Sequence, residues 1–396
     1  MESTKNKMEI KLIGSTNNLR TQEDMLKFGQ SCGRQCYSEK DFEELYSEPY
    51  KSELTEGRLL KSGHHSPFEH INLTFAMKGI PKALAMVLNN ERQYATSEKS
   101  ARYTIMKDMQ SEQKELYDKW KGVFQEIISQ EYPESKFPGL YVLGSDKKTP
   151  LQKLAQENAR YVTSVFTPTK MVHTINLRQL KFVMDELRKY DSVCRQKNDG
   201  PFKPFESSLW KFLPEFLSQL SEYNIPGLEN QTDRHLSMFN FEEKPEHFSD
   251  VYSTNYFISF AGLAQAHRHR TISYNMQTPE KDAPYGFFVP KLIRNTGLDR
   301  DWIKDLIQLS ENGTFPQAQL IKVRERGNIE DFRSKCILRL CGHAQNEIME
   351  NTKQTATRYA IHEPEIAGWI APKCQQDIKC KGACIWGGKM ALERLV

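Results

Sequence analysis

The same order of predicted elements occurs twice along the chain. INLTFAMKGI at 71–80 begins with alternating apolar residues, typical of a strand, and PKALAMVLNNERQ at 81–93 predicts a helix with Pro81 in its first turn. VYSTNYFISF at 251–260 again predicts a strand, and AGLAQAHRHR at 261–270 predicts the start of a helix. Each pair is followed by a polar segment and then by helices. The sequence therefore indicates duplication of one small domain rather than a solenoid of many repeats.

The remaining chain is mostly helical in pattern. The segments 112–131 and 151–190 are predicted to be rich in helix, and helical segments are predicted at 300–310 and 330–355. The run RQKNDGPFKP at 195–204 is polar and contains glycine and proline, so it marks a boundary region.

Composition excludes several classes of protein. The 396 residues suffice for two domains, and 38% hydrophobic with 27% charged residues is typical of a globular chain. A net charge of +4, without a motif of aromatic and basic residues on a strand, argues against a nucleic-acid partner. No apolar run of about 18 residues is present, which predicts no membrane span. MESTKNKMEI at the start lacks the apolar core of a secretory signal, so we expect a cytoplasmic protein.

RHRTISYN at 268–275 places three cationic or ionisable side chains next to an apolar segment. In a helix these three side chains point about 100° apart, so one neighbour cannot pair with all of them. Guanidinium groups bind phosphate or carboxylate through paired hydrogen bonds, which favours an extended polyanion as the partner. The alternative is a solvated basic turn.

RHRTISYN resembles the R-H-R-x-x-S-x-N-x-x-S-x-R motif of the flavin-dependent thymidylate synthases, the ThyX family. The matching residues are Arg268, His269, Arg270, Ser273 and Asn275, together with Gln265 upstream. Thr278 and Glu280 stand where the motif has serine and arginine.

The first half resembles complementary parts of the same family pattern. NERQYATSEKSARY at 90–103 lacks the R-H-R run and has Asn90, Glu91 and Arg92 in its place. It retains the E-x-S-x-R end. GHHSPFEHINLTF at 63–75 resembles the H-x-x-P-F-E-H segment, and NARYVTS and HTINLRQL follow at the family's spacing. In the second half, LRLCGHAQNEI at 338–348 resembles L-R-x-x-x-H-A-Q-x-E-I.

The resemblance implies a role for each matching residue. The implied catalytic residues are Arg339, Arg268 and His64. The implied flavin contacts are Arg268, His269, Arg270, His64, Ser66, Asn176, Arg178 and His343. The implied nucleotide contacts are Gln265, Glu98, Ser100, Ala101, Arg102, Arg160 and Arg339. The implied cofactor is FAD, and the implied reaction converts dUMP to dTMP with methylenetetrahydrofolate and NADPH as co-substrates.

The resemblance also implies an α+β fold of two tandem units, 1–225 and 226–396, each a small antiparallel sheet packed with long helices. Because each half keeps a different part of the motif, we hypothesise composite active sites formed by both halves. The expected assembly is a homodimer equivalent to the homotetramer of the family.

Several alternatives stay open. The same flavin and folate chemistry could act on another pyrimidine nucleotide such as dCMP, or the chain could bind nucleotide or flavin without catalysis. Singly, residues such as Arg160 or Arg178 would be surface charges, and His343 a hydrogen-bonded core histidine. The eight cysteines are expected to be free thiols; zinc at Cys374, Cys380 and Cys384 is the alternative, and no metal is expected.

Overall fold

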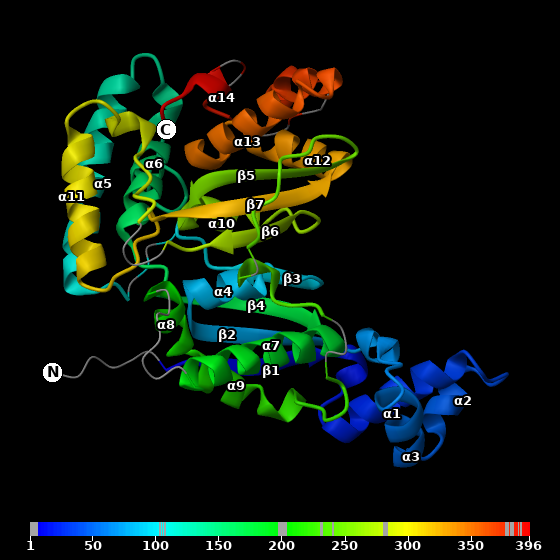
Figure 1. The fold of residues 1–396 in the computed structure, drawn as a ribbon. Helices are drawn as coiled ribbons and strands as arrows, with labels where there is room; N and C mark the ends of the chain where they lie inside the picture. The colour runs from blue at the N-terminus through cyan, green and yellow to red at the C-terminus, as the bar shows by residue number, and fades with distance from the viewer. Residues whose placement is uncertain are drawn as a thin grey trace. The chain divides into compact units, whose positions relative to one another are not determined.

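The computed structural model describes residues 7–102, 104, 106, 108–196, 204–229, 233–239, 241–279, 284–376, 380, 384–386, 388 and 390–396. The chain divides into two compact units, each made of two stretches (Figure 1). Unit 1 comprises Met1–Lys99 and Pro168–Leu236, and unit 2 comprises Ser100–Thr167 and Ser237–Val396. This division differs from the predicted split at 225/226, because the stretch from residue 100 to 167 packs with the second half of the chain. Whether the halves are repeats stays a prediction.

Unit 1 is built on a four-stranded antiparallel sheet in the order β1-β2-β4-β3. The strands are β1 (Glu9–Ser15), β2 (Asn72–Pro81), β3 (Tyr94–Glu98) and β4 (Pro168–Asn176). The strand predicted at 71–80 is confirmed, and its alternate residues are buried. The segment 151–190, predicted to be helix-rich, also contains β4, whose buried residues alternate and which pairs along the whole of β2.

Helices of unit 1 lie along this sheet and beyond its end (Figure 1). Thr21 and Asp24 form a capping box at the start of α1, and the side chain of Asn176 accepts from the backbone of Gln179 at the start of α7. The helices are α1 (Gln22–Gln35), α2 (Phe42–Ser47), α3 (Ser52–Leu54), a π-helical turn (Thr55–Leu60), a 3₁₀ turn (Ser66–His70), α4 (Lys82–Leu88), α7 (Leu177–Gln196), α8 (Pro204–Trp210) and α9 (Leu213–Gln219).

Unit 2 contains a three-stranded antiparallel sheet in the order β5-β7-β6. Its strands are β5 (Val251–Ser259), β6 (Ser273–Gln277) and β7 (Leu320–Asn328). The strand predicted at 251–260 is therefore confirmed. Its helices are α5 (Ser111–Glu131), α6 (Pro150–Ala159), α10 (Phe260–Ala266), α11 (Leu298–Glu311), α12 (Ile329–Arg339), α13 (Asn346–Tyr359) and α14 (Met390–Glu393).

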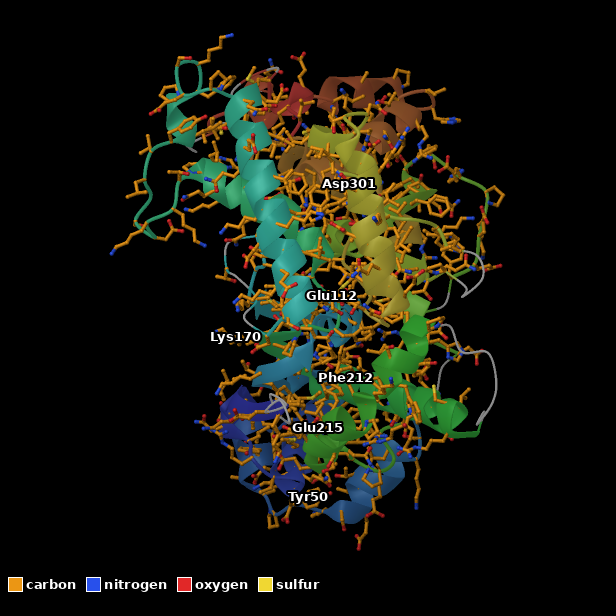
Figure 2. The ribbon with its side chains drawn as sticks, turned by 90° about the vertical axis from the view of Figure 1, so that its left-hand side faces the viewer. Tyr50, Glu112, Lys170, Phe212, Glu215 and Asp301 are labelled. Atoms are coloured by element: carbon orange, nitrogen blue, oxygen red, sulfur yellow. The ribbon has the colours of Figure 1, made fainter. Side chains whose placement is uncertain are left out.

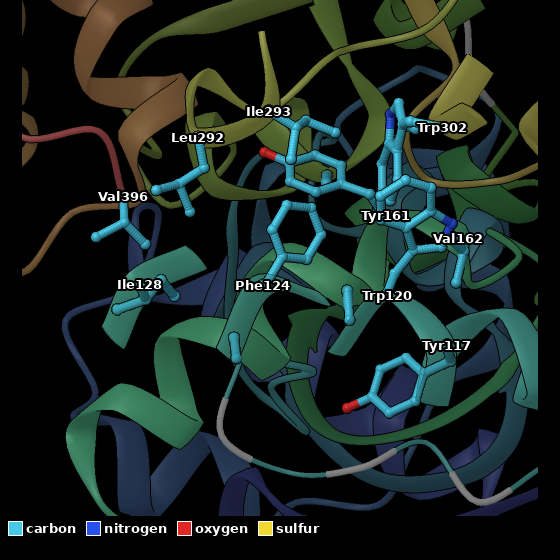
Figure 3. Close-up of a cluster of buried hydrophobic side chains, with 14 of the residues drawn as sticks. Tyr117, Trp120, Phe124, Ile128, Tyr161, Val162, Leu292, Ile293, Trp302 and Val396 are labelled. Carbon is cyan, nitrogen blue, oxygen red and sulfur yellow. The ribbon is translucent and has the colours of Figure 1, made fainter. Parts of the chain in front are cut away.

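The long helices α5 and α11 of unit 2 run side by side in opposite directions (Figure 2). Glu112, in the first turn of α5, accepts hydrogen bonds from Gln308 and Asn312 at the end of α11. Between the helices lies an aromatic core in which Trp120 and Trp302 meet edge to face, with ring centroids 4.9 Å apart (Figure 3). This packing attaches the segment from 100 to 167 to the second half of the chain.

The predicted fold class is confirmed: small antiparallel sheets are packed with helices in both units. Over the described part of the chain, no helix combines the length and apolar character that crossing a membrane requires.

Candidate functional site

The RHR run at 268–270 lies in a turn and not in a helix. α10 ends at Ala266, so the helix predicted through residue 270 is shorter than expected. The chain must turn here because β6 begins only a few residues later and pairs with β7. The two arginines of the run are exposed, whereas His269 is buried.

His269 contacts an arginine that the sequence also identified. Nε of Arg339, at the end of α12, donates to Nε2 of His269 at 2.8 Å, and Nη2 donates to the carbonyl oxygen of Gln265 at 2.8 Å. Burial, followed by the charges of Arg339 and Lys335, lowers the pKa of His269 to about 2. The imidazole is therefore neutral at physiological pH and acts as an acceptor for Arg339.

Gln345 connects two other predicted residues. Its Oε1 accepts from Nη2 of Arg160 and from Nε2 of Gln265, and its own Nε2 donates to the hydroxyl of Tyr161 at 2.6 Å. Among the described residues, the buried Nε of Arg160 and Oε1 of Gln265 have no hydrogen-bond partner. These two residues therefore keep hydrogen-bonding capacity that the described protein groups do not use.

Glu347 extends this hydrogen-bond network through Tyr161. Its carboxylate accepts from the backbone and hydroxyl of Ser259, at 2.8 and 2.7 Å, and from the hydroxyl of Tyr161 at 2.7 Å. Burial raises the pKa of Glu347 in spite of these donors. Burial raises the pKa of Tyr161 as well, so its hydroxyl stays protonated and can donate.

Arg102 reaches the same unit from the first half of the sequence. Its Nε donates to Oε2 of Glu157 at 2.7 Å, and its Nη2 donates to the carbonyl oxygen of His343 at 3.0 Å. The imidazole of His343 is itself exposed. Ser100 and Ala101 directly precede Arg102, whose backbone nitrogen donates to the hydroxyl of Ser100 at 3.3 Å.

The arginines of this cluster act on one another. Burial is the main cause of the lowered pKa of Arg160 and Arg339, and the charge of Arg102 lowers both further. The pKa of Arg339 falls to about 10, so it remains a cation at neutral pH. Mutual repulsion of three neighbouring guanidinium groups would be relieved by a bound anion. We call the residues Arg102, Arg160, Gln265 and Arg339 the arginine cluster.

The predicted flavin residues of the first half line cavities in unit 1. His64, Ser66 and Asn176 lie in the wall of a cavity of about 1070 Å³ between α1 and the end of the sheet. A volume of this size falls at the upper end of the range for bound cofactors. His64 and Ser66 are placed there by the 3₁₀ turn that leads into β2.

Arg178 lines a second cavity of unit 1, of about 490 Å³. The two cavities share the wall residues Glu69, Gln93 and Asn176. Nη1 of Arg178 donates to the carboxylate of Glu69 at 2.5 Å. His64, Ser66, Asn176 and Arg178 thus lie in the walls of two adjoining cavities of unit 1, and their contact with flavin stays a prediction.

Glu98 does not belong to the arginine cluster. It ends β3 in unit 1, where its carboxylate is bonded to Lys82 at 2.7 Å and its side chain is only 1% exposed. Glu280, the departure from the motif noted above, lies outside the described residues.

Sequence reasoning missed three residues that bond to the arginine cluster directly or through Gln345, and one buried cation of the same unit. The three are Glu157, Tyr161 and Glu347, and the cation is Lys335, which is bonded to Glu325. A signal was present for two of them, since Tyr161 stands in NARYVTS and Glu347 is the glutamate of H-A-Q-x-E-I. Glu157 and Lys335 lie outside every quoted motif, and only their burial beside charged partners identifies them.

All eight cysteines are free thiols, as expected. Among the residues that the structure describes, no group of three or more His, Cys, Asp or Glu side chains is arranged to hold a metal ion.

Residues 19–191 match the family model of the thymidylate synthase complementing protein. The flavin-dependent thymidylate synthase of Pyrococcus furiosus is 30% identical over 156 residues, which cover 37% of this chain and 57% of that protein. The enzyme of the same name from Clostridium tetani is 27% identical over 183 residues, which cover 44% of this chain and 71% of that protein. This chain therefore spans little more than half the length of the first of these relatives.

Solved structures give weaker similarity. ThyX from Helicobacter pylori, crystallised with FAD and dUMP, is 18% identical with a TM-score of 0.31, covering 56% of this chain and 94% of that chain. The UMP/dUMP methylase PolB from Streptomyces cacaoi is 19% identical with a TM-score of 0.30, covering 46% and 78%. By the family model and the curated relatives, residues 19–191 are similar to the flavin-dependent thymidylate synthases.

Proposed function

We propose that the protein is an FAD-dependent thymidylate synthase, which converts dUMP to dTMP with methylenetetrahydrofolate as carbon donor and NADPH as reductant. The observation that carries the proposal is the arginine cluster. Its members come from segments as far apart as residues 102 and 339, yet they are joined through Gln345, His343 and the backbone of Gln265. This combination suits a nucleoside monophosphate, because guanidinium groups bind phosphate oxygens strongly and an amide can hydrogen-bond to a base.

Each member of the cluster has a distinct part in this proposal. Arg102, with Ser100 beside it, would bind the phosphate, because guanidinium and hydroxyl groups donate to phosphate oxygens. Gln265 and Arg160 would contact the nucleoside through the buried polar atoms that lack a partner among the described residues. Arg339 would face the pyrimidine carbonyl, where its charge stabilises negative charge that develops on the ring in the reaction.

The larger cavity of unit 1 fits a flavin dinucleotide in size and in its polar lining of His64, Ser66 and Asn176. When bound, FAD supplies the hydride chemistry, while these side chains bind and orient it. With a flavin as hydride donor, no protein nucleophile is required. Consistently, burial raises the pKa of Cys32 in this cavity to about 11 and that of Cys336 on α12 to about 12, so both remain thiols.

The proposal includes composite active sites. The second half contributes Arg268 and Arg270, and the first half contributes His64, Asn176 and Arg102, so neither half has the full set of motif residues. A homodimer with pockets formed by both halves would supply each element once per pocket.

The test is anaerobic turnover with dUMP, methylenetetrahydrofolate, FAD and NADPH, with dCMP as a parallel substrate. Arg102→Ala and Arg268→Ala should each abolish dTMP formation, whereas Arg300→Ala on the exposed side of α11 should not. Methylation of dCMP alone would transfer the proposal to another nucleotide. Bound flavin with no product from either nucleotide would refute synthase activity.

A further inference from the structure

The smaller cavity of unit 1 is lined by three arginines that come from separate parts of the chain. Arg92 precedes β3, Arg178 lies in the first turn of α7, and Arg234 lies in the segment that ends the unit. Arg234 is outside residues 19–191, which match the family model. It therefore adds a charge at this cavity that the matched segment does not contain.

The guanidinium group of Arg234 is held in one orientation by three neighbours. Nη1 donates to Oε1 of Gln179 at 2.9 Å, and Nη2 donates to the carbonyl oxygen of Arg92 at 3.2 Å. The group also stacks over the ring of Phe182, with its central carbon 3.9 Å from the ring centroid. Because the Arg234 side chain is already ordered by these contacts, it loses less conformational entropy when a ligand binds.

The carboxylates at this cavity already have cationic partners. Glu69 is bonded to Arg178, and Glu229 is 3.4 Å from Lys181. Glu91 is buried, with its Oε2 at 3.8 Å from Nη2 of Arg234. The side chains of Arg178 and Arg234 remain 41% and 45% exposed, so both guanidinium groups can still reach a ligand in the cavity.

We propose that Arg234, with Arg92 and Arg178, forms an anion site for the diphosphate group of the flavin dinucleotide; this rests on the proposed function. The run Asn90–Arg92 has one arginine where the family motif has two. Arg234 is hydrogen-bonded to the backbone of this run and replaces the missing cation. The cavity adjoins the larger one through Glu69, Gln93 and Asn176, so one elongated ligand can extend from one to the other.

The experiment compares two flavins that differ in phosphate. FAD and riboflavin are titrated against the full chain by flavin fluorescence, for the wild type, Arg234→Gln and Arg195→Gln. Arg195 is an exposed arginine of α7 in the same unit, paired with Asp191 and outside both cavities. Arg234→Gln should weaken FAD binding by about 10- to 100-fold, the loss of one or two charge-assisted hydrogen bonds. Riboflavin binding should not change, and Arg195→Gln should bind both like the wild type.

Inorganic pyrophosphate separates this inference from the proposed function, because it reports on the anion site without flavin. Pyrophosphate binding that is lost in Arg234→Gln, in a protein that binds no flavin, would support the anion site and refute the flavin enzyme. FAD binding that is equal in wild type and Arg234→Gln would overturn the inference and leave the proposed function standing. Equal weakening of FAD and riboflavin would also overturn it, because the effect would then not involve phosphate.

A rescue variant guards against misfolding. Asn90→Arg restores the second arginine of the run, and in the Arg234→Gln background it should recover FAD affinity. Arg234→Lys, which keeps a cation at this position, should also bind FAD better than Arg234→Gln does. If Arg234→Gln unfolds at the wild-type temperature, but neither Arg234→Lys nor the double variant Asn90→Arg/Arg234→Gln binds FAD better than Arg234→Gln, the result would count against a role of cationic charge.

Discussion

Arg339 donates from Nε to Nε2 of His269 at 2.8 Å, which fixes the tautomer of the histidine with its proton on Nδ1. The same arginine donates from Nη2 to the carbonyl oxygen of Gln265. Its guanidinium plane is therefore set by two acceptors, one on α10 and one in the turn that carries the RHR run. The contact of His269 with flavin stays a prediction, and in the structure its Nε2 is an acceptor for Arg339. This relationship makes the neutrality of His269 a condition for the site.

Replacing His269 should separate an acceptor role from a simple packing role. His269→Phe fills the space but leaves Nε of Arg339 without an acceptor, and under the proposed function we expect kcat for dTMP formation to fall by about 10- to 100-fold. His269→Asn can still offer an oxygen and should retain more activity. Steady-state kinetics with dUMP measures both. Equal loss of activity in the two variants would contradict the acceptor role.

The stability of the protein should depend on pH through His269. Above pH 6.5 the imidazole is neutral in both the folded and the unfolded chain, so it contributes no pH dependence. Below pH 6.5 the imidazole takes up a proton in the unfolded chain, whereas in the folded chain it does so only at about pH 2. The free energy of unfolding therefore decreases as the pH is lowered. Between pH 6.5 and 5 the loss is roughly 2 kcal/mol. Urea unfolding at several pH values gives the free energy of unfolding as a function of pH. Below pH 6.5 this free energy should change less steeply with pH in His269→Asn than in the wild type. The same pH dependence in both proteins would exclude His269 as the cause.

The sequence predicted local features well because local patterns determine them. The alternation at the start of 71–80, and the β-branched and aromatic residues of 251–260, predict strands, and both strands are present. The motif residues Arg102 and Arg339 were predicted to serve one site, and the structure places both in unit 2.

Long-range pairing could not be read from the same patterns. Each unit consists of two separate stretches of sequence. In unit 1 these stretches are joined by the pairing of β4 with β2, and in unit 2 by the packing of Trp120 against Trp302, which are more than 180 residues apart in the chain. The supporting carboxylates were missed for a related reason: Glu157 and Glu347 lie on helices with other polar residues, and only tertiary packing buries them.

The stability of the protein should depend more on the acceptor oxygens of Glu347 than on its negative charge. Glu347→Leu leaves the donors from Ser259 and Tyr161 unsatisfied in a buried place, and we expect a loss of about 3 kcal/mol in the free energy of unfolding. Glu347→Gln keeps one acceptor oxygen and should cost about 1 kcal/mol. Urea denaturation of the two variants gives both values. A greater loss in the glutamine variant would show that the charge itself is required.

Lys335 of α12 and Glu325 of β7 form a fully buried ion pair in unit 2, with Nζ and Oε2 2.5 Å apart. The hydroxyls of Tyr252 and Tyr256 also donate to Glu325, at 2.6 and 2.5 Å. Lys335→Met would leave the carboxylate buried without its cation, and we expect a loss of about 3–5 kcal/mol in unfolding free energy. Adding Glu325→Gln removes the unpaired charge and still offers the tyrosines an acceptor.

The double variant Lys335→Met/Glu325→Gln should therefore recover much of that stability, with a coupling energy above about 1 kcal/mol in a double-mutant cycle. Purely additive losses would contradict the importance of the pair. Lys335 precedes Arg339 by about one turn of α12, so the pair also anchors the end of the helix that carries the arginine. We accordingly expect Lys335→Met to reduce dTMP formation even at a temperature where the variant is fully folded, and the double variant to regain activity as it regains stability. Full activity of folded Lys335→Met would restrict the ion pair to a role in stability.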